Sequence, residues 1–140
     1  MVTNNLKRRI LSQYTIESYY SVIIHVPEQK IRKSEINVSR LKRIKNKLAY
    51  AHKLALRGNF QEALLLNGQV YGKAMGLDTS VMSRALAAGA VTAGITGTGP
   101  ATVILAEPDK QDDIVSVIGP AFKLIITGLN RKKVNIRMDR

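Results

Sequence analysis

The sequence predicts a single α+β domain of the ferredoxin-like, or split βαβ, type, in which helices cover one face of an antiparallel sheet. Short β-branched runs alternate with segments of helical period in the order strand, helices, strand, strand, helix, strand. The chain also has 140 residues, 45% hydrophobic and 23% charged, which suits one globular core. We therefore expect residues 1–140 to form one domain, without repeats, linkers or low-complexity segments.

The first strand and the first helix have clear local signals. Tyr19 to Val26 is a β-branched and aromatic run, and Pro27 closes it because proline lacks the N–H that a strand ladder needs. From Ser39 to Arg57 the apolar residues recur at steps of three and four, which predicts an amphipathic helix. Gly58 follows at the position where a left-handed helix cap is expected.

A second helix is expected directly after the first. Asn59 and Glu62 have the spacing of a capping pair, and the helical period continues from Phe60 to Met75. Gly76 then follows as a candidate helix end. A third helix is expected to run to about Ala88, with one of three consecutive polar residues as its cap: Asp78, Thr79 or Ser80.

The second half of the chain predicts most of the sheet. Small or β-branched apolar runs flank a glycine turn, and a mildly helical stretch separates them from a further β-branched run. The expected elements are strands at Ala90–Ile95 and Thr102–Ala106, a helix from Asp109 to about Ala121, a strand at Phe122–Thr127 and a short edge strand at Lys133–Arg137.

The net charge is +12, from 22 Lys and Arg against 10 Asp and Glu. Such a charge attracts anions such as nucleotides, small carboxylic acids or nucleic acid, and its sign alone does not choose among them. The basic residues of the segment from Arg40 to Lys53 alternate with its apolar stripe, which is typical of a solvated helix face. They also allow a second hypothesis, a non-enzymatic, basic ferredoxin-like module that binds RNA. The small number of aromatic residues, five Tyr and two Phe, argues against base stacking.

Several site classes are not expected. The chain has no cysteine, and its two histidines, His25 and His52, lack metal-ligand spacing, so we expect no metal held by this chain alone. We interpret His25, in an apolar strand, as a core residue. Because no apolar run approaches the roughly 20 residues of a membrane span and no signal core is seen, we expect a soluble, cytoplasmic protein.

The glycine-rich run from Gly94 to Pro100 is the most distinctive feature. A tight connection between strands uses glycine freely, so a plain turn is one interpretation. The neighbouring residues are almost all small, however, which exposes backbone amides that suit phosphate oxygens. The run is neither a Walker A loop nor Gly-x-Gly-x-x-Gly, because Thr102 stands where a third glycine would be.

The segment Ala88-Gly-Ala-Val-Thr-Ala-Gly-Ile-Thr-Gly-Thr-Gly-Pro-Ala101 resembles the third motif of the GHMP kinases, and specifically that of the archaeal shikimate kinases. Further segments resemble the same family in the same order, so the resemblance covers essentially the whole chain. They are Val2–Leu11, Gly58–Leu64, Leu66-Asn67-Gly68 with Tyr71, and Lys123–Asn130. Asn4 replaces an acidic residue of the family pattern, so the role of that carboxylate is not carried over to this chain.

The resemblance covers only the second half of that family. Its members carry the principal ATP-binding loop and the acidic residue thought to act on the substrate hydroxyl in a preceding domain, and neither is found in these residues. The resemblance thus implies a GHMP kinase C-terminal domain without its own catalytic base. It implies either a shortened chain or an enzyme divided into two polypeptides, which is inactive without the N-terminal ATP-binding half.

The resemblance also implies a reaction and its ligands. The expected activity is that of a shikimate kinase, in which ATP with Mg²⁺ carried by the nucleotide phosphorylates shikimate to shikimate 3-phosphate for aromatic amino acid synthesis. Homoserine kinase is the nearest alternative within the family. Nucleic acid and membrane partners are not expected.

By resemblance, the loop closes over the transferring phosphoryl group and the acceptor hydroxyl. Its expected residues are Gly94, Thr96, Gly97, Thr98, Gly99 and Pro100. The Thr98 hydroxyl either touches ligand or caps the turn. Asn67 is expected to tie its helix to the loop. Arg84 is a candidate for the substrate carboxylate, with a solvated surface residue as the alternative.

Overall fold

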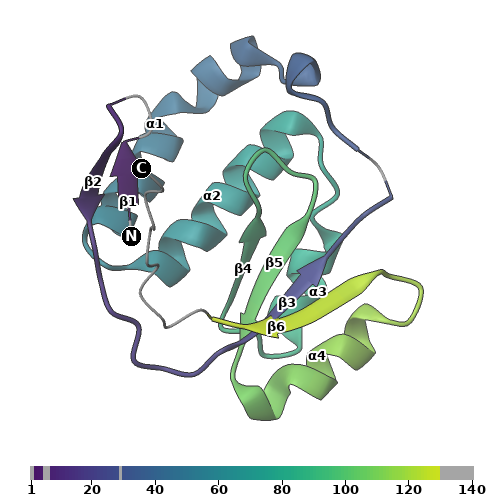
Figure 1. The fold of residues 1–140 in the computed structure, drawn as a ribbon. Coiled ribbons are helices and arrows are strands. Elements are labelled where there is room, and N and C mark those ends of the chain that lie inside the picture. The colour runs from purple at the N-terminus through teal and green to yellow at the C-terminus, as the bar shows by residue number, and fades with distance from the viewer. Residues whose placement is uncertain (1, 5–6, 29, 130–140) are drawn as a thin grey trace, which may run out of the picture.

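The computed structural model describes residues 2–4, 7–28 and 30–129. Its main sheet has the strand order β4-β5-β3-β6, and every neighbouring pair is antiparallel (Figure 1). The strands are β3 (Ser21–His25), β4 (Thr92–Ile95), β5 (Thr102–Ala106) and β6 (Leu124–Gly128). With helices between β3 and β4 and between β5 and β6, this is the ferredoxin-like arrangement, and the predicted fold class is confirmed. The edge strand expected at Lys133–Arg137 lies outside the described residues.

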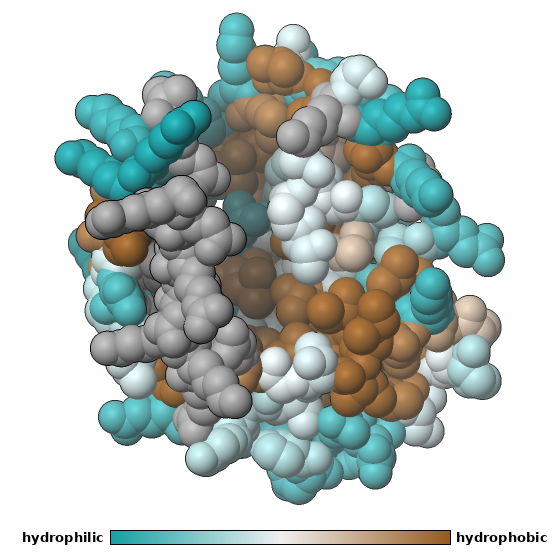
Figure 2. Space-filling model, in the orientation of Figure 1, coloured by the Kyte–Doolittle hydropathy of each residue, from teal (hydrophilic) through white to brown (hydrophobic). Residues whose placement is uncertain are grey.

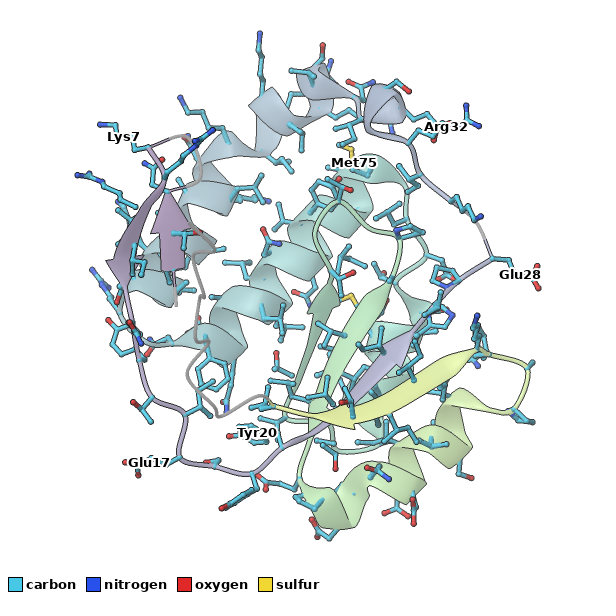
Figure 3. The ribbon with its side chains drawn as sticks, in the orientation of Figure 1. Lys7, Glu17, Tyr20, Glu28, Arg32 and Met75 are labelled. Atoms are coloured by element: carbon cyan, nitrogen blue, oxygen red, sulfur yellow. The ribbon has the colours of Figure 1, made fainter. Side chains whose placement is uncertain are left out.

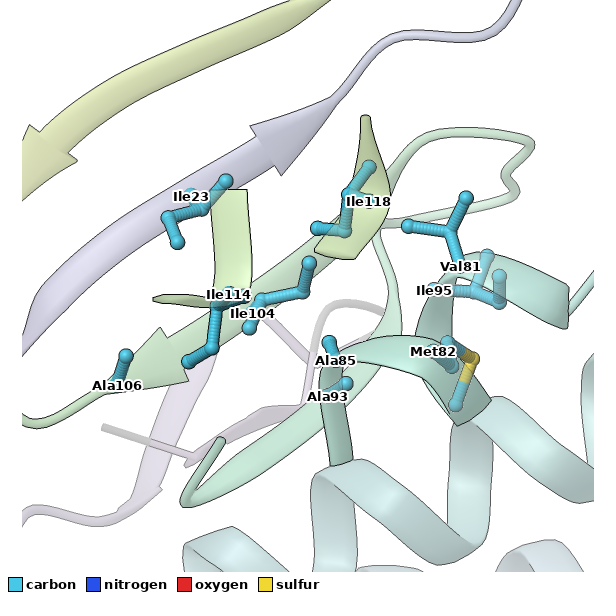
Figure 4. Packing of buried hydrophobic residues seen from close by; sticks show 10 residues of the cluster. All are labelled: Ile23, Val81, Met82, Ala85, Ala93, Ile95, Ile104, Ala106, Ile114 and Ile118. Atoms are coloured by element: carbon cyan, nitrogen blue, oxygen red, sulfur yellow. The ribbon is translucent and has the colours of Figure 1, made fainter. Parts of the chain in front are cut away.

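The core lies between this sheet and two short helices, α3 (Ser80–Ala87) and α4 (Gln111–Ile118). Ile23 at the centre of β3 stands opposite Ile104 on β5, and both side chains are fully buried. Ile114 and Ile118 on one face of α4 pack against them (Figure 4). Alternate residues of the strands and residues three or four apart on the helices thus face each other. These are the apolar positions that the periods in the sequence predict to be buried.

The two longer helices form a hairpin beside the sheet. Helix α2 (Phe60–Met75) runs alongside β4, and α1 (Val38–Leu56) packs against α2 (Figure 1). Gly58 and Gly76, which follow them, have positive φ of 85° and 68°, as the predicted left-handed ends require. Leu65 of α2 also packs against the core that α3 and α4 cover, so the hairpin as well as the two short helices contributes to one core.

Two helix starts differ from expectation. Asn37 caps α1, since its Oδ1 accepts a hydrogen bond from the Arg40 N–H at 3.0 Å. Asn59 stands at the start of α2, but its side chain makes no cap hydrogen bond, so the capping pair predicted from its spacing to Glu62 does not form. Helix α4 is shorter than predicted, because the 3-10 turn Pro108–Lys110 precedes it and Gly119 ends it.

A small hairpin of β1 (Val2–Asn4) and β2 (Arg9–Ser12) was not expected as secondary structure. With three and four residues, the two strands are too short to show a clear alternation of apolar and polar residues. Asn4 Oδ1 accepts a hydrogen bond from the Lys7 N–H at 2.9 Å, and Arg8 takes a left-handed φ of 48°. A 3-10 turn, η1 (Lys33–Glu35), precedes α1. Within the described ranges, no helix is both long and apolar enough to cross a bilayer.

Candidate functional site

The glycine-rich loop joins β4 to β5 and folds as a tight turn. The Gly99 N–H donates to the Thr96 carbonyl at 2.8 Å, which closes a four-residue turn over 96–99. At its neck, the Thr96 N–H donates to the Ala101 carbonyl at 2.8 Å. Gly97 has a φ of +52°, and Thr98 has no positive φ, which is the φ pattern of a type II′ turn. A glycine is therefore required at position 97 for the turn itself.

The three loop glycines differ in their surroundings. A Cβ at Gly97 would meet no atom within 4 Å, so this position faces open space. A Cβ at Gly99 would lie 2.8 Å from Leu77 Cδ1, so the Leu77 side chain packs against Gly99. Gly94, grouped with the loop by sequence, lies instead inside β4, buried against Leu64 of α2. Its place in the fold gives it a packing role.

The loop offers hydrogen-bond donors to a ligand. Gly97 and Thr98 are exposed, and their N–H groups are engaged by no other group in the described part of the chain. Consecutive free amides of this kind suit the oxygens of a phosphate. The hydroxyls of Thr96 and Thr98 lie beside them, and neither makes a hydrogen bond to the turn among the residues that the structure describes. Pro100, which follows Gly99 through a cis peptide bond, leads into β5.

The hydrogen bond from α2 to the loop comes from Tyr71. Its hydroxyl donates to the Thr98 carbonyl at 3.0 Å. Asn67, which was expected to make this connection, lies one turn earlier on the same face of α2 and makes no hydrogen bond to the loop within the described residues. Tyr71 was quoted only as part of the resemblance. No local pattern marks it, because its partner is 27 positions away.

Asn67 instead lines an apolar cavity of about 460 Å³ on the outer side of α2. Its walls come from α1, α2, β1 and the segment that follows β2, and include Ala51, His52, Phe60 and Tyr14. Figure 2 shows a hollow over α2 in this region, and a separate apolar area over β3, β5 and β6. The cavity and the loop are thus linked through one face of α2, which carries Asn67 and Tyr71.

The Arg84 side chain contacts the Phe122 ring and the carboxyl end of α4. The Arg84 guanidinium carbon lies 5.7 Å from the centre of the Phe122 ring, and Nη1 donates to the Ile118 carbonyl at 3.4 Å. A cation at the carboxyl end of α4 interacts favourably with the helix dipole. These contacts engage the Arg84 side chain at the surface, where the residue is exposed, so its role toward a substrate carboxylate stays a prediction.

His25 is 8% exposed, and its ring packs edge-on against Phe122 at 5.1 Å between centres. Burial lowers the pKa of His25, and the nearby Asp78 carboxylate opposes that effect. His25 is therefore a core residue, as expected. It stands opposite Thr102, whose hydroxyl is buried without a hydrogen-bond partner in the described part of the chain.

The charged groups of the described residues do not gather into a metal site. Among the residues that the structure describes, no group of three or more Asp, Glu or His side chains lies close enough to hold a metal ion. The Lys and Arg residues of α1 are exposed, as a solvated helix face requires, and the helix contains no acidic residue. They are Arg40, Lys42, Arg43, Lys45, Lys47 and Lys53.

Comparison of sequences finds relatives over most of the chain. It is 36% identical over 114 residues to the shikimate kinase of Methanothermobacter thermautotrophicus, a match that covers 81% of this chain and 39% of that protein. It is 31% identical over 135 residues to the shikimate kinase of Methanosarcina acetivorans, covering 94% and 45%. The chain thus spans less than half the length of the curated relatives it matches. The resemblance to archaeal shikimate kinases is confirmed, while no family model matches the chain.

Solved structures share the fold. The structure of L. major mevalonate kinase in complex with R-mevalonate superposes with a TM-score of 0.56 at 16% identity, covering 81% of this chain and 43% of that one. The homoserine kinase from Cytophaga hutchinsonii gives 0.53 at 15% identity, covering 91% and 46%. Both are GHMP kinases, and at such identities the likeness concerns the fold alone.

Proposed function

We propose that this relative of the archaeal shikimate kinases forms the C-terminal domain of an ATP-dependent shikimate kinase, which converts shikimate and ATP to shikimate 3-phosphate and ADP. The observation that carries the proposal is the sequence match over 81% and 94% of the chain to two enzymes of that name. The exposed loop amides of Gly97 and Thr98 support it, because they are the kind of group that phosphoryl transfer uses.

In phosphoryl transfer, a protein acts mainly by positioning the reactants and by stabilising the charge that develops on the phosphoryl group. As the acceptor oxygen forms its bond to the γ-phosphorus and the bond to the ADP oxygen breaks, charge spreads over the equatorial oxygens. The N–H groups of Gly97 and Thr98 would donate to these oxygens, and the open space at Gly97 allows a close approach. A well-placed donor to developing charge is worth roughly 3 to 4 kcal/mol. The hydroxyl proton of the acceptor would leave to a base in the other half of the enzyme.

ATP with Mg²⁺ is the proposed cofactor. The loop amides fit phosphate oxygens, whereas the described residues hold no cluster of carboxylates for a metal. The ion would therefore be held by the nucleotide and by the ATP-binding half, and would neutralise charge on the phosphates when bound. The net charge of +12 would favour the approach of ATP and of an acidic acceptor.

The other proposed partner is an N-terminal ATP-binding half. The matched relatives are more than twice as long as the regions that this chain matches. Because the resemblance places the acidic residue thought to act on the substrate hydroxyl in that half, we expect this chain to be inactive alone.

Shikimate is preferred over homoserine as the acceptor. Both relatives compared above are named shikimate kinase, while a homoserine kinase is found as a fold neighbour at 15% identity.

The residues of the main sheet argue against the RNA-binding hypothesis. None of the strands β3, β4, β5 and β6 carries a Tyr, Phe or Trp on which a base could stack.

A hybrid kinase tests the proposal. This chain replaces the matching region of the Methanothermobacter thermautotrophicus enzyme, and ADP release is measured with shikimate, with homoserine and without acceptor. We expect release that depends on shikimate, and none from this chain alone. A folded hybrid that phosphorylates homoserine but not shikimate would contradict the acceptor. A folded hybrid without any acceptor-dependent turnover would contradict the kinase assignment.

A further inference from the structure

Tyr71 is held in one orientation at the carboxyl end of α2. It shares the wall of a small cavity of about 160 Å³ with Ile31, Ile36 and Leu77, which come from the segment before α1 and the turn after α2. Tyr71 and Leu77 also pack against the core cluster. The phenol ring is therefore half-buried, and its hydroxyl reaches the loop carbonyl of Thr98.

Both ends of one loop peptide group are fixed by hydrogen bonds. The Thr98 carbonyl and the Gly99 N–H belong to the same planar group. The carbonyl accepts from Tyr71 Oη at 3.0 Å, and the N–H donates to the Thr96 carbonyl at 2.8 Å. Rotation of this plane would break both bonds. The next N–H groups toward the amino end, those of Gly97 and Thr98, are the exposed ones that no other group engages.

The protonation of the phenol suits this contact. Burial raises the pKa of Tyr71 above its ordinary value, so its hydroxyl stays a donor throughout the neutral range. The packing of α2 on β4 does not depend on this hydroxyl, because it runs through Leu64 and Gly68 against Gly94. Loss of the hydroxyl should therefore act on the loop and leave the fold intact.

We propose that Tyr71 is a positioning residue for phosphoryl transfer: by holding the Thr98 carbonyl it fixes the turn over 96–99, and so keeps the Gly97 and Thr98 amides available to the phosphoryl group. The role in catalysis rests on the proposed kinase function. The effect on the loop does not, and it can be measured in this chain without any substrate.

Amide exchange tests the effect on the loop. Tyr71→Phe removes only the hydroxyl, and exchange of the Gly99 N–H, which reports the turn, is followed by NMR. We expect this exchange to speed up roughly tenfold, as loss of one hydrogen bond implies. The matched control is Tyr20→Phe, which removes the hydroxyl that accepts a hydrogen bond from Gln61 Nε2 at 3.0 Å. Tyr20 packs against Phe60 at the start of α2, whereas Met75 is the last residue of that helix (Figure 3), so this control should leave exchange at Gly99 unchanged.

Kinetics of the hybrid kinase test the effect on catalysis. Tyr71→Phe should lower kcat roughly tenfold, with both KM values within about twofold, because a looser loop weakens contacts made mainly in the transition state. Tyr20→Phe should keep kcat. An unchanged Gly99 exchange rate in Tyr71→Phe, or an equal change in Tyr20→Phe, would overturn the inference about the loop. Faster exchange with an unchanged kcat in an active hybrid would overturn the catalytic part. An inactive unmodified hybrid would bear on the proposed function alone, since the exchange experiment still decides the loop.

Discussion

Gly68 of α2 and Gly94 of β4 lie in direct backbone contact: a Cβ at Gly68 would stand 2.8 Å from the Cα of Gly94. The helix can approach the strand this closely only because neither residue has a side chain. A glycine inside a helix costs about 1 kcal/mol relative to alanine, which this close packing offsets. Gly94 is thus part of the scaffold that supports the loop.

Gly94→Ala should destabilise the protein strongly. Its methyl group would lie 2.5 Å from Leu64 Cδ1 and 2.7 Å from the Leu64 carbonyl oxygen, which belongs to the helix backbone and cannot move aside. We expect a loss of about 3 kcal/mol or more in the free energy of unfolding, measured by urea denaturation. Gly128→Ala, in a strand position with open space, serves as the control and should change stability little. Equal stability of the two variants would contradict the packing role of Gly94.

Gly97→Asp should abolish most kinase activity. Asp and Asn are similar in size and should strain the turn at this positive φ to a similar degree, and the position is open, so a comparison of the two variants isolates the effect of charge. Asp adds a negative charge beside the proposed phosphoryl group, which should reduce kcat/KM roughly a hundredfold relative to Gly97→Asn in the hybrid kinase. If the two variants have the same kcat/KM, the loop does not contact the phosphoryl group.

Thr102→Val should stabilise the protein. Thr102 is 1% exposed, and its hydroxyl has no hydrogen-bond partner in the described part of the chain. Removal of a buried, unpaired hydroxyl should gain about 1 kcal/mol. The equally buried Thr92 offers the matched change. Its hydroxyl donates to the Gln61 carbonyl at 2.7 Å, so Thr92→Val should lose about 1 kcal/mol. Thermal unfolding of both variants should show shifts of opposite sign; a shared sign would contradict this account.

Stability should fall on mild acidification because of His25. Burial lowers its pKa below the ordinary 6.5, so the unfolded chain binds a proton that the folded chain resists. Stability is therefore fully present above pH 6.5 and declines below it, by at most about 1.4 kcal/mol per pH unit. The pKa of Asp78 is lowered from 3.8, mainly by the Ser80 N–H, so its loss of stability occurs at more acidic pH.

Denaturation at pH 5.0 and pH 7.5 measures this dependence. His25→Gln should flatten it, whereas His52→Gln, the same change at an exposed position of α1, should keep it. A slope that survives His25→Gln would assign the effect to another group.

The start of α1 should depend on Asn37. Its side chain accepts the Arg40 N–H, so Asn37→Ala should cost about 1 kcal/mol of stability. Asn59→Ala should cost less, because the Asn59 side chain makes no cap hydrogen bond. Urea denaturation of the two variants compares them directly, and a larger loss at Asn59 would show that the cap was assigned to the wrong helix.

Local patterns predicted most elements of the fold. The periods of two and of 3.6 residues, with glycine at the ends of helices, predicted the strands of the main sheet and the helices nearly to their bounds. They did so because burial of one face imposes these periods on the sequence itself. The β1–β2 hairpin was not predicted, because strands of three and four residues are too short to show a period. The proposed chemistry of the loop came from the ordered resemblance to the archaeal shikimate kinases, since glycines alone indicate a turn as readily as an anion site.

The roles of individual residues at the loop came from contacts between distant segments. Gly94 and Gly97 are alike in sequence, but α2 packs on the first and open space surrounds the second. Tyr71 reaches Thr98, and His25 faces Thr102, only because the sheet and α2 bring these segments together. Such pairings depend on strand order, register and helix packing, which no local period of the chain encodes.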